Sequence, residues 1–355
     1  MKPGILNDLD VHPRVIAAAR RVGIATSWRV LEHSLGELKT KTGLSPTDTE
    51  RLMDAAALQC CPPFLTGSQI LQKIEERGCL LISTGCPKLD EALGGGVPCV
   101  GLTELAGESG SGKTQFGLQL ALQCQLPVAL GGLGKSVAYI CTETQFPVSR
   151  LNQLISFRKN QQTFNKKGFS DNIFVHHLPD MDNLVDCVHY QLPQFVSQRA
   201  VGLVIIDSVA AVFRAAEEPQ ELKSKMVKQL GYRLRQLADQ QNVAILAINQ
   251  VTAMFGGNIH GIIDDDLVPA LGLSWTNLVT TRIMLRNTSF VLQQNSAEES
   301  SKDQIVPKSI RVPEIRVRSL DILFCPWLPR KSSPFIVTEE GIKDTETNSI
   351  TISCN

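Results

Sequence analysis

The chain has 355 residues, of which 43% are hydrophobic and 20% are charged, and its 35 basic and 35 acidic residues give no formal net charge. This length and apolar content predict a globular protein with a large core and a smaller module, and they exclude a largely disordered chain. A protein that binds nucleic acid strongly by itself is usually basic overall, so any DNA-binding surface here has to be local.

The ten cysteines contain no CxxC pair, so the spacing predicts no zinc site. Cys124 and Cys141 lie inside apolar runs, where a thiol acts as a small buried hydrophobic group, and this use fits a reducing compartment. The first residues lack the apolar stretch of a signal peptide, and no run approaches the roughly 18 apolar residues of a membrane span. We therefore expect no association with a membrane.

Residues 1–58 are predicted to form a small helical module. Pro13 can begin a helix that runs toward Val22, and the apolar residues between Trp28 and Leu35 indicate a second short helix.

A glycine turn follows within the same module. Gly43 can adopt a left-handed conformation, and Ser45 can cap a helix that has Pro46 at its first position. A helix, a glycine turn and a capped helix form the outline of a helix-hairpin-helix unit, which can hold a DNA phosphate with backbone N–H groups. Lys39 and Lys41, beside the turn, are candidate DNA contacts. A small bundle that contacts another protein is an equally good interpretation.

Residues 59–80 are predicted to be a linker, because Pro62 and Pro63 stop any helix and only a short amphipathic run follows. From residue 81 to 355 apolar strands alternate with helices. The expected strands cover 102–106, 137–141, 173–177, 203–207, 243–249 and 279–285, and the expected helices include 115–126, 181–196 and 222–241. Continuous Val/Ile/Leu strands of this kind predict the α/β class with a mostly parallel sheet that is buried on both faces.

Residues 107–114 read Gly-Glu-Ser-Gly-Ser-Gly-Lys-Thr, a complete phosphate-binding loop between an expected strand and an expected helix. Its glycines let successive N–H groups converge on an anion, and the helix start adds a positive dipole end. Lys113 brings a charge to the outer phosphates, and the Thr114 hydroxyl can hold Mg²⁺. An ordinary surface turn is the alternative. The candidate nucleotide-binding residues are Gly107, Glu108, Ser109, Gly110, Ser111, Gly112, Lys113 and Thr114.

Three later strands end in polar residues. The strand at 137–141 is expected to pack beside the strand at 102–106 and to deliver Glu143 as a general base, unless this residue is a cap or an ion-pair partner. Asp207 ends another strand, where a carboxylate can orient Mg²⁺, although Asp is common at strand ends. Asn249 and Gln250 end a third strand, and an amide there can sense a γ-phosphate or simply form a turn.

The C-terminal part is expected to be less regular. Residues 287–307 are polar and are predicted to be mobile, and residues 310–317 and 334–337 are predicted to be closing strands.

Together these segments resemble the eukaryotic branch of the RecA-type recombinase family. Residues 103–115 are similar to the family's phosphate loop with its flanks, and Thr142-Glu143 is similar to the segment that carries the family's catalytic Glu. The resemblance covers nearly the whole chain from about residue 9, and it implies a RecA-like ATP-binding core over 81–355.

The resemblance also implies roles for individual residues. Glu143 and Lys113 would serve catalysis, Arg150 would stack on adenine, and Gln250 would belong to the strand end that opens the second DNA-binding loop. The linker from Phe64 to Gly67 resembles a tether by which one protomer docks onto the next, with the Phe in a pocket and a small residue beside it.

Residues 9–19, 139–143 and 206–214 resemble a paralogue within this family rather than its strand-exchange enzyme. This implies homologous-recombination repair of DNA double-strand breaks and a hetero-oligomer with another recombinase paralogue. It also implies action on DNA junctions or on the main recombinase filament, with ATP and Mg²⁺ as cofactors. A nuclear location with some cytoplasmic protein, and slow DNA-dependent ATP hydrolysis, would follow.

The two loops with which the family holds DNA are poor in cations here. In the first loop only Arg214 is basic, and the second loop, at 252–266, contains His260 and the carboxylates of Asp264, Asp265 and Asp266. Adjacent carboxylates repel phosphates, so we expect the chain alone to bind DNA weakly. The triplet fits a solvated acidic turn better than a divalent-cation site.

Two basic features remain as candidate DNA contacts, the expected helix at 222–241 and the pair Lys39 and Lys41. The basic residues of the expected helix at 222–241 fit a solvated helix face or a DNA contact. Three functions were compatible with these patterns: an ATP-binding recombination mediator, a structural adaptor with a passive nucleotide, and a hexameric motor, against which the acidic loops argue.

Overall fold

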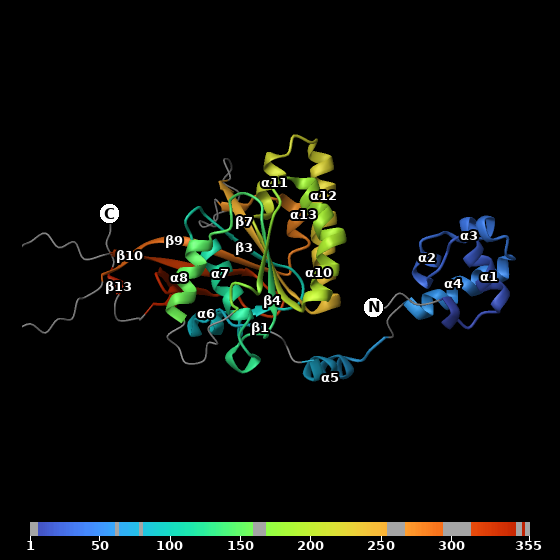
Figure 1. Ribbon diagram of the computed structural model, residues 1–355, viewed down its shortest axis with the longest axis horizontal. Coiled ribbons are helices and arrows are strands. Elements are labelled where there is room, and N and C mark those ends of the chain that lie inside the picture. Colours follow the sequence, from blue (N-terminus) through green and yellow to red (C-terminus); the bar gives the residue numbers. More distant parts are fainter. Residues whose placement is uncertain are drawn as a thin grey trace, which may run out of the picture. The chain divides into compact units, whose positions relative to one another are not determined.

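The computed structural model describes residues 6–60, 64–77, 81–158, 168–253, 267–293, 314–345 and 350–351. The chain divides into two compact units, Met1–Gly78 and Cys79–Asn355 (Figure 1). Of the helices in these described ranges, none combines the length and the apolar composition that crossing a bilayer requires.

The first unit is entirely helical in its described part. Its elements are η1 (Leu6–Asp8), α1 (Pro13–Arg21), α2 (Ser27–Leu31), α3 (Leu35–Thr42), α4 (Pro46–Cys60) and α5 (Gly67–Arg77). Small and branched apolar side chains form its core, among them Leu6, Val15, Val30, Leu38 and Leu52. Because this core is small, it supports a compact bundle of short helices.

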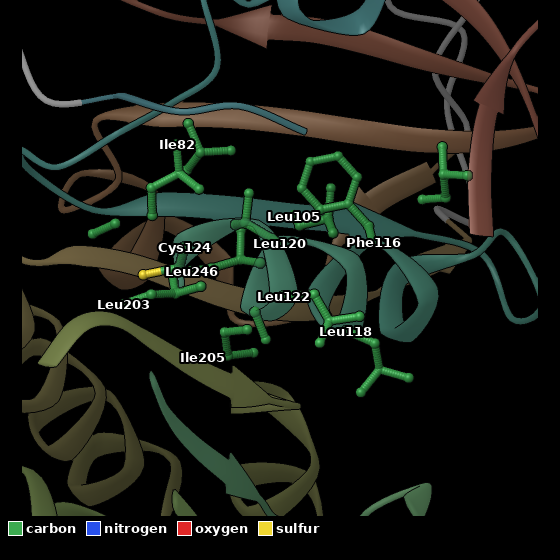
Figure 2. Close-up of a cluster of buried hydrophobic side chains, with 14 of the residues drawn as sticks. Ile82, Leu105, Phe116, Leu118, Leu120, Leu122, Cys124, Leu203, Ile205 and Leu246 are labelled. Atoms are coloured by element: carbon green, nitrogen blue, oxygen red, sulfur yellow. The ribbon is translucent and has the colours of Figure 1, made fainter. Parts of the chain in front are cut away.

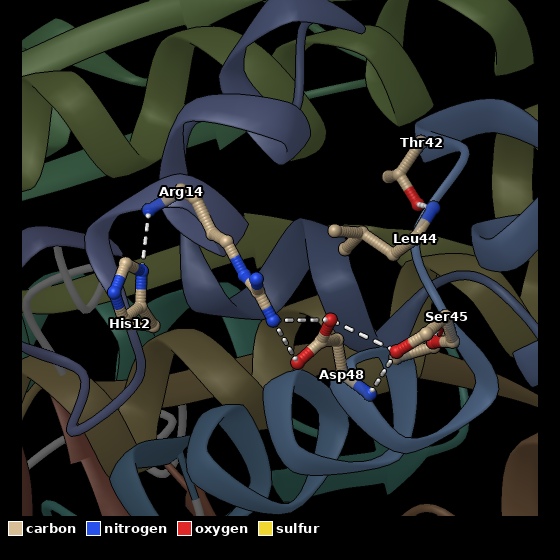
Figure 3. Close-up of polar contacts among 7 residues, drawn as sticks. His12, Arg14, Thr42, Leu44, Ser45 and Asp48 are labelled. Carbon is tan, nitrogen blue, oxygen red and sulfur yellow. Dashed lines mark hydrogen bonds and ion pairs between the residues drawn. The ribbon is translucent and has the colours of Figure 1, made fainter.

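The glycine turn lies between α3 and α4 as predicted. Gly43 has φ +67°, and α4 begins at Pro46 after Ser45. The Ser45 Oγ accepts a hydrogen bond of 3.1 Å from the Asp48 amide, and the Asp48 carboxylate also pairs with Arg14 of α1 at 3.1 Å (Figure 3). These contacts fix the start of α4 against α1, so a helix, a glycine turn and a capped helix follow one another as expected, and a helix-hairpin-helix role in DNA binding stays a prediction.

The predicted docking segment lies at the start of α5. The Phe64 side chain is fully exposed, and Gly67 is the first residue of the helix. Thr66 and Gln69 cap the start of the helix reciprocally. The backbone N–H of Gln69 donates to Thr66 Oγ1 (3.2 Å), and the backbone N–H of Thr66 donates to Gln69 Oε1 (2.9 Å). The segment predicted as a linker thus contains a capped helix.

The second unit is built on a large sheet. Its strands are β3 (Thr103–Gly107), β4 (Ser136–Cys141), β5 (Ile173–His177), β6 (Val201–Asp207), β7 (Ala244–Ala253), β8 (Leu267–Pro269), β9 (Thr281–Gln293), β10 (Glu314–Phe324), β11 (Ser332–Thr338), β12 (Gly341–Asp344) and β13 (Ile350–Thr351). A separate pair joins β1 (Leu81–Ile82) and β2 (Val97–Pro98).

The order along the sheet is β12-β11-β10-β9-β3-β7-β6-β4-β5, with β8 paired to β7 and β13 to β9. The six strands from β9 to β5 are parallel, whereas β10, β11 and β12 extend the sheet by antiparallel pairing. The mostly parallel sheet agrees with the expected RecA-like core, and the all-α module precedes this core in the sequence.

Helices cover both faces of the sheet (Figure 1). One face carries α6 (Pro87–Ala92), α7 (Lys113–Cys124) and α8 (Val148–Arg158), and the short η2 (Val128–Leu130) follows α7. The other carries α9 (Met181–Asp186), η3 (Cys187–Gln191), α10 (Leu192–Arg199), α11 (Val209–Ala215), α12 (Gln220–Gln241) and α13 (Gly272–Thr276).

Alternation along the strands divides the core into two layers. In β6, Leu203 and Ile205 face the α7 layer, and Val204 and Ile206 face the α12 layer. The α7 helix is buried on every side from Phe116 to Cys124, as Figure 2 shows for its contacts with the sheet. Because α7 is packed on all sides, its position is fixed, and so is the position of the loop at 107–112 that precedes it.

Three sequence-based expectations need correction. First, β4 does not pack beside β3, because β7 and β6 lie between them. Second, residues 287–293 are not irregular: they continue β9 and pair with β10. The rest of the segment predicted as mobile lies outside the described residues.

Third, the strand expected at 310–317 is β10, which runs to Phe324, and residues 310–313 lie outside the described residues. The segment expected to be helical at 181–196 is helical throughout, as α9, η3 and α10, and η3 is a π-helical turn within it. Pro193 stands in the first turn of α10 and has no N–H to donate to the preceding turn, which accounts for the wider turn there.

Candidate nucleotide-binding site

A cavity of about 710 Å³ opens at the carboxyl ends of the parallel strands. This is the edge where open α/β sheets generally bind ligands. Its volume is within the usual range for small-molecule sites. Its lining residues are Gly107, Ser109, Gly110, Gly112, Lys113, Thr114, Gln115, Glu143, Thr144, Asp207, Ser208, Gln250, Val251, Arg318 and Val337.

The phosphate loop forms the floor of this cavity. Gly112 has φ +102° and precedes α7, whose first turn receives no side-chain cap. A Cβ atom on Gly107 would come within 2.5 Å of the Leu285 carbonyl oxygen, so no side chain fits there. Six of the eight predicted loop residues line the cavity. Of the other two, Glu108 accepts a bond of 3.0 Å from Asn287, and Ser111 is buried, with no partner for its Oγ among the described residues.

Lys113 lies across the loop. Its Nζ donates to the carbonyl oxygens of Gly107 at 2.8 Å and of Glu108 at 2.6 Å. Burial lowers the pKa of the Lys113 ammonium, while the nearby Asp207, Glu108 and Glu143 carboxylates oppose this shift. The ammonium is therefore a partly desolvated cation that an anion in the loop would stabilise further.

Asp207, at the end of β6, is held by two hydroxyl groups. Thr114 Oγ1 donates to Asp207 Oδ2 at 2.8 Å, and the Tyr139 hydroxyl donates to the same oxygen at 2.9 Å. Burial raises the pKa of the Asp207 carboxyl, and the two hydrogen bonds oppose this. Burial also raises the pKa of Tyr139 well above its usual value, so this hydroxyl stays a donor. The Thr–Asp pair is the donor set expected of a Mg²⁺ site beside a phosphate loop.

Glu143 and Gln250 also meet at the cavity, although β4 and β7 are not neighbours. Gln250 Nε2 donates to Glu143 Oε2 at 2.7 Å. The expectation that β4 delivers Glu143 next to the phosphate loop therefore holds for the residue, even though the assumed strand pairing was wrong.

A fully buried carboxylate lies behind these residues. Glu104 accepts from Asn249 Nδ2 (2.7 Å), from Trp275 Nε1 (2.9 Å) and from Arg282 Nε (2.5 Å). These bonds join β3, β7, α13 and β9 in the interior. The cluster fixes the residue before Gln250, and sequence analysis treated Glu104 only as a flank of the phosphate loop.

Arg150, the adenine candidate, lies at the start of α8 and does not line the cavity. Its guanidinium donates to Gln115 Oε1 at 2.7 Å and to the carbonyl oxygens of Thr338 and Glu339 at 2.6 and 2.8 Å. These bonds occupy the edge of the planar group, and only its faces remain for stacking. Its role toward adenine stays a prediction.

Sequence reasoning missed two residues at this site. Tyr139 lies in the middle of an apolar strand. The sequence could have indicated its role, because the hydroxyl group of a buried tyrosine needs a hydrogen-bond partner. Arg318 comes from β10, one residue beyond the predicted end of its strand. The register of β10 shifts between Arg316 and Arg318, and such a bulge breaks the alternation by which a strand is recognised.

None of the DNA candidates within the described residues is among the residues that line the cavity. Arg214 is exposed near the end of α11, and Lys39 and Lys41 are exposed in the last turn of α3. Lys225 and Lys228 border a shallow hollow on α12. His260 and the Asp264–Asp266 triplet lie outside the described residues.

Comparisons with known proteins agree with this geometry. A model of the Rad51 family matches residues 75–291, which is more than half of the chain. The chain is 36% identical to the DNA repair protein XRCC3 of Mus musculus, over 95% of this chain and 97% of that protein. It is 33% identical to XRCC3 of Bos taurus with the same coverage, and 32% identical to the DNA repair protein rhp57 of Schizosaccharomyces pombe over 76% of this chain and 84% of that protein.

These similarities confirm the resemblance to a paralogue that was expected from residues 9–19, 139–143 and 206–214, because proteins named XRCC3 match the chain over 95% of its length. On its sheet order, its phosphate loop and its matches along nearly the whole length, the chain belongs to the Rad51 family.

Proposed function

We propose that this chain is an ATP-binding recombinase paralogue of homologous-recombination repair, which assembles with another recombinase paralogue and acts on DNA junctions or on the recombinase filament. The names of its relatives support the role in DNA repair, and one of them, a meiotic recombination protein DMC1 homolog of Lilium longiflorum, supports the role in recombination. Its site of action would then be the nucleus, with some protein in the cytoplasm.

The observation that carries the nucleotide part of the proposal is the convergence of three groups on one cavity. These are the Lys113 ammonium, the Thr114–Asp207 pair and the Gln250–Glu143 pair. The uncapped start of α7 and the buried Ser111 hydroxyl fit a phosphate group as well.

The residues would divide the work as follows. Backbone N–H groups of the loop and Lys113 would hold phosphates, and Thr114 with Asp207 would hold Mg²⁺. Glu143 would take a proton from water, and Gln250 would keep its carboxylate in place. When bound, Mg·ATP would supply the negatively charged phosphates that the loop and Lys113 hold, and the terminal phosphoanhydride bond that water breaks.

Direct titration of the purified protein, alone and in its paralogue complex, with labelled ATP and Mg²⁺ tests this proposal. Lys113→Ala is expected to weaken ATP binding and to loosen the association with the partner. A partner complex that is equally tight with and without nucleotide would contradict an ATP-dependent interface. No uptake of ATP by the wild-type protein would remove the nucleotide function altogether.

The exposure of Phe64 supports a second candidate, a structural adaptor in which the nucleotide is passive. A fully exposed aromatic ring beside a capped helix is a suitable anchor for a pocket on another protein. Under this alternative, Phe64→Glu abolishes assembly, and Lys113→Ala leaves it intact. A pull-down with both variants separates the two functions.

A further inference from the structure

Arg318 lies against the phosphate loop from the antiparallel part of the sheet. It is partly buried in β10 and lines the cavity with Gly110 and Gly112. Its Nε donates to the Gly110 carbonyl oxygen at 3.4 Å, and its Cδ lies 3.8 Å from the position that a Cβ atom on Gly112 would occupy. The side chain thus forms one wall of the loop.

The guanidinium has no acidic partner within the described part of the chain. Among the described residues its hydrogen-bond acceptors are two carbonyl oxygens, of Gly110 and Arg316, both at 3.4 Å, which is long for a hydrogen bond. The carboxylates of Asp321 and Glu108 already have other partners, because Arg286 pairs with Asp321 at 3.0 Å and Asn287 donates to Glu108 at 3.0 Å. Burial, and after it the nearby positive charge of Arg316, lower the pKa of Arg318. This shift agrees with a guanidinium that has no negative charge beside it.

The charged side chains that line the cavity are separated by sign, with carboxylates on one flank of β3 and Arg318 on the other. Glu143 and Asp207 stand at the ends of β4 and β6, on one flank of the phosphate-loop strand β3. Arg318 comes from β10 on the opposite flank, and Lys113 lies between. The acidic flank suits a metal ion, and the Arg318 flank suits phosphate oxygens that the metal does not face.

We propose that Arg318 is a second phosphate-binding cation of this site, supplied by the same chain, which donates to the phosphate oxygens of a bound nucleoside triphosphate. This inference rests on the proposed ATP-binding function. A guanidinium presents several donors in one plane and matches a phosphate better than a point charge does. Bound phosphate would also supply the counter-ion that the partly buried group lacks.

Three variants test the contact in the protein as purified with its partner: Arg318→Gln, Arg318→Lys and Arg316→Gln. Arg316 is a matched control, because it is exposed on the same strand two residues away and does not line the cavity. Titration with a fluorescent ATP analogue and Mg²⁺ is expected to show about ten-fold weaker binding for Arg318→Gln. Arg318→Lys should bind with intermediate affinity, and Arg316→Gln should bind like the wild type.

Salt dependence provides a second measurement. Removing a phosphate contact should make the affinity of Arg318→Gln fall less steeply with KCl concentration than that of the wild type. Circular dichroism measures whether each variant is folded. If Arg318→Gln does not fold, Arg318→Lys still tests the contact. Wild-type affinity in Arg318→Gln, or equal weakening in Arg316→Gln, overturns this inference but leaves the proposed function standing. Absence of ATP binding by the wild type overturns both.

Discussion

Gln250 donates a hydrogen bond of 2.7 Å to Glu143, although the strands that carry the two residues are separated by β6. The bond leaves the other carboxylate oxygen of Glu143 available to accept a proton. Glu143→Gln is therefore expected to slow ATP hydrolysis by about 100-fold or more, with ATP affinity nearly unchanged. Single-turnover phosphate release measures the rate, and hydrolysis at the wild-type rate would mean that the base is another group.

Gln250→Ala tests the positioning of that carboxylate separately. The substitution removes the donor and frees the Glu143 side chain, which is otherwise exposed. We expect a loss in hydrolysis rate of about ten-fold, smaller than that of Glu143→Gln, because the base remains present but less well oriented. The same phosphate-release assay ranks the two variants. A larger loss for Gln250→Ala would indicate that Gln250 contacts the reacting group directly.

Asp207 predicts the pH dependence of Mg²⁺-dependent binding. Because burial raises the pKa of this carboxyl, it takes up a proton at a higher pH than an ordinary Asp, and a protonated carboxyl does not hold Mg²⁺. Affinity should be full above that raised pKa and should fall as pH decreases through it. Titrations from about pH 8 to about pH 5 measure this, with an unperturbed Asp titrating near 4 as the reference.

The control for this measurement is Asp207→Asn. Protonation of ATP itself weakens binding to both proteins alike, so the difference between their pH profiles isolates the carboxyl group. Parallel profiles for wild type and Asp207→Asn would exclude Asp207 as a metal-holding group.

Tyr139→Phe should move the same pH profile. The Tyr139 hydroxyl is one of two donors that hold the pKa of Asp207 down, so its removal raises that pKa further and shifts the loss of Mg²⁺-dependent binding to higher pH. The ring keeps its edge-to-face contact with Phe146 at 4.9 Å, and stability should fall by only about 1 kcal/mol. An unshifted profile would show that Thr114 alone holds the carboxylate.

The parts of the site that could be predicted are those encoded in contiguous residues. The eight positions of the loop from Gly107 to Thr114 are contiguous and match a known pattern, and Asp207 directly ends an apolar strand. The glycine turn and Ser45 cap were predictable for the same reason, since each depends on the conformational preference of one or two residues.

The parts that escaped prediction depend on contacts between distant segments. The separation of β4 from β3 results from the order in which helices cross the sheet, which no local pattern encodes. Residues 287–293 are polar, yet they form a strand because β10 pairs with them. The bulge before Arg318 hides the end of β10, so a residue of the cavity wall was placed outside any predicted element.

Among the ion pairs in the described part of the second unit, the buried Glu104–Arg282 pair should be the most sensitive for stability. Glu104 is completely buried and Arg282 is 14% exposed, so the guanidinium keeps its charge in the interior if the carboxylate is removed. Glu104→Gln is therefore expected to lower the free energy of unfolding by about 3–5 kcal/mol. Urea unfolding followed by circular dichroism measures the change.

Two comparisons make this prediction specific. Glu91→Gln breaks a pair with Lys331 in the same unit, at 2.8 Å, but both side chains are exposed to water, and no measurable change is expected. Combining Glu104→Gln with Arg282→Met removes the uncompensated charge as well, so the double variant should recover part of the stability that Glu104→Gln loses. Equal destabilisation by Glu104→Gln and Glu91→Gln would mean that the interior at Glu104 is open to water, and the buried cluster could not then hold Asn249, the neighbour of Gln250, in place.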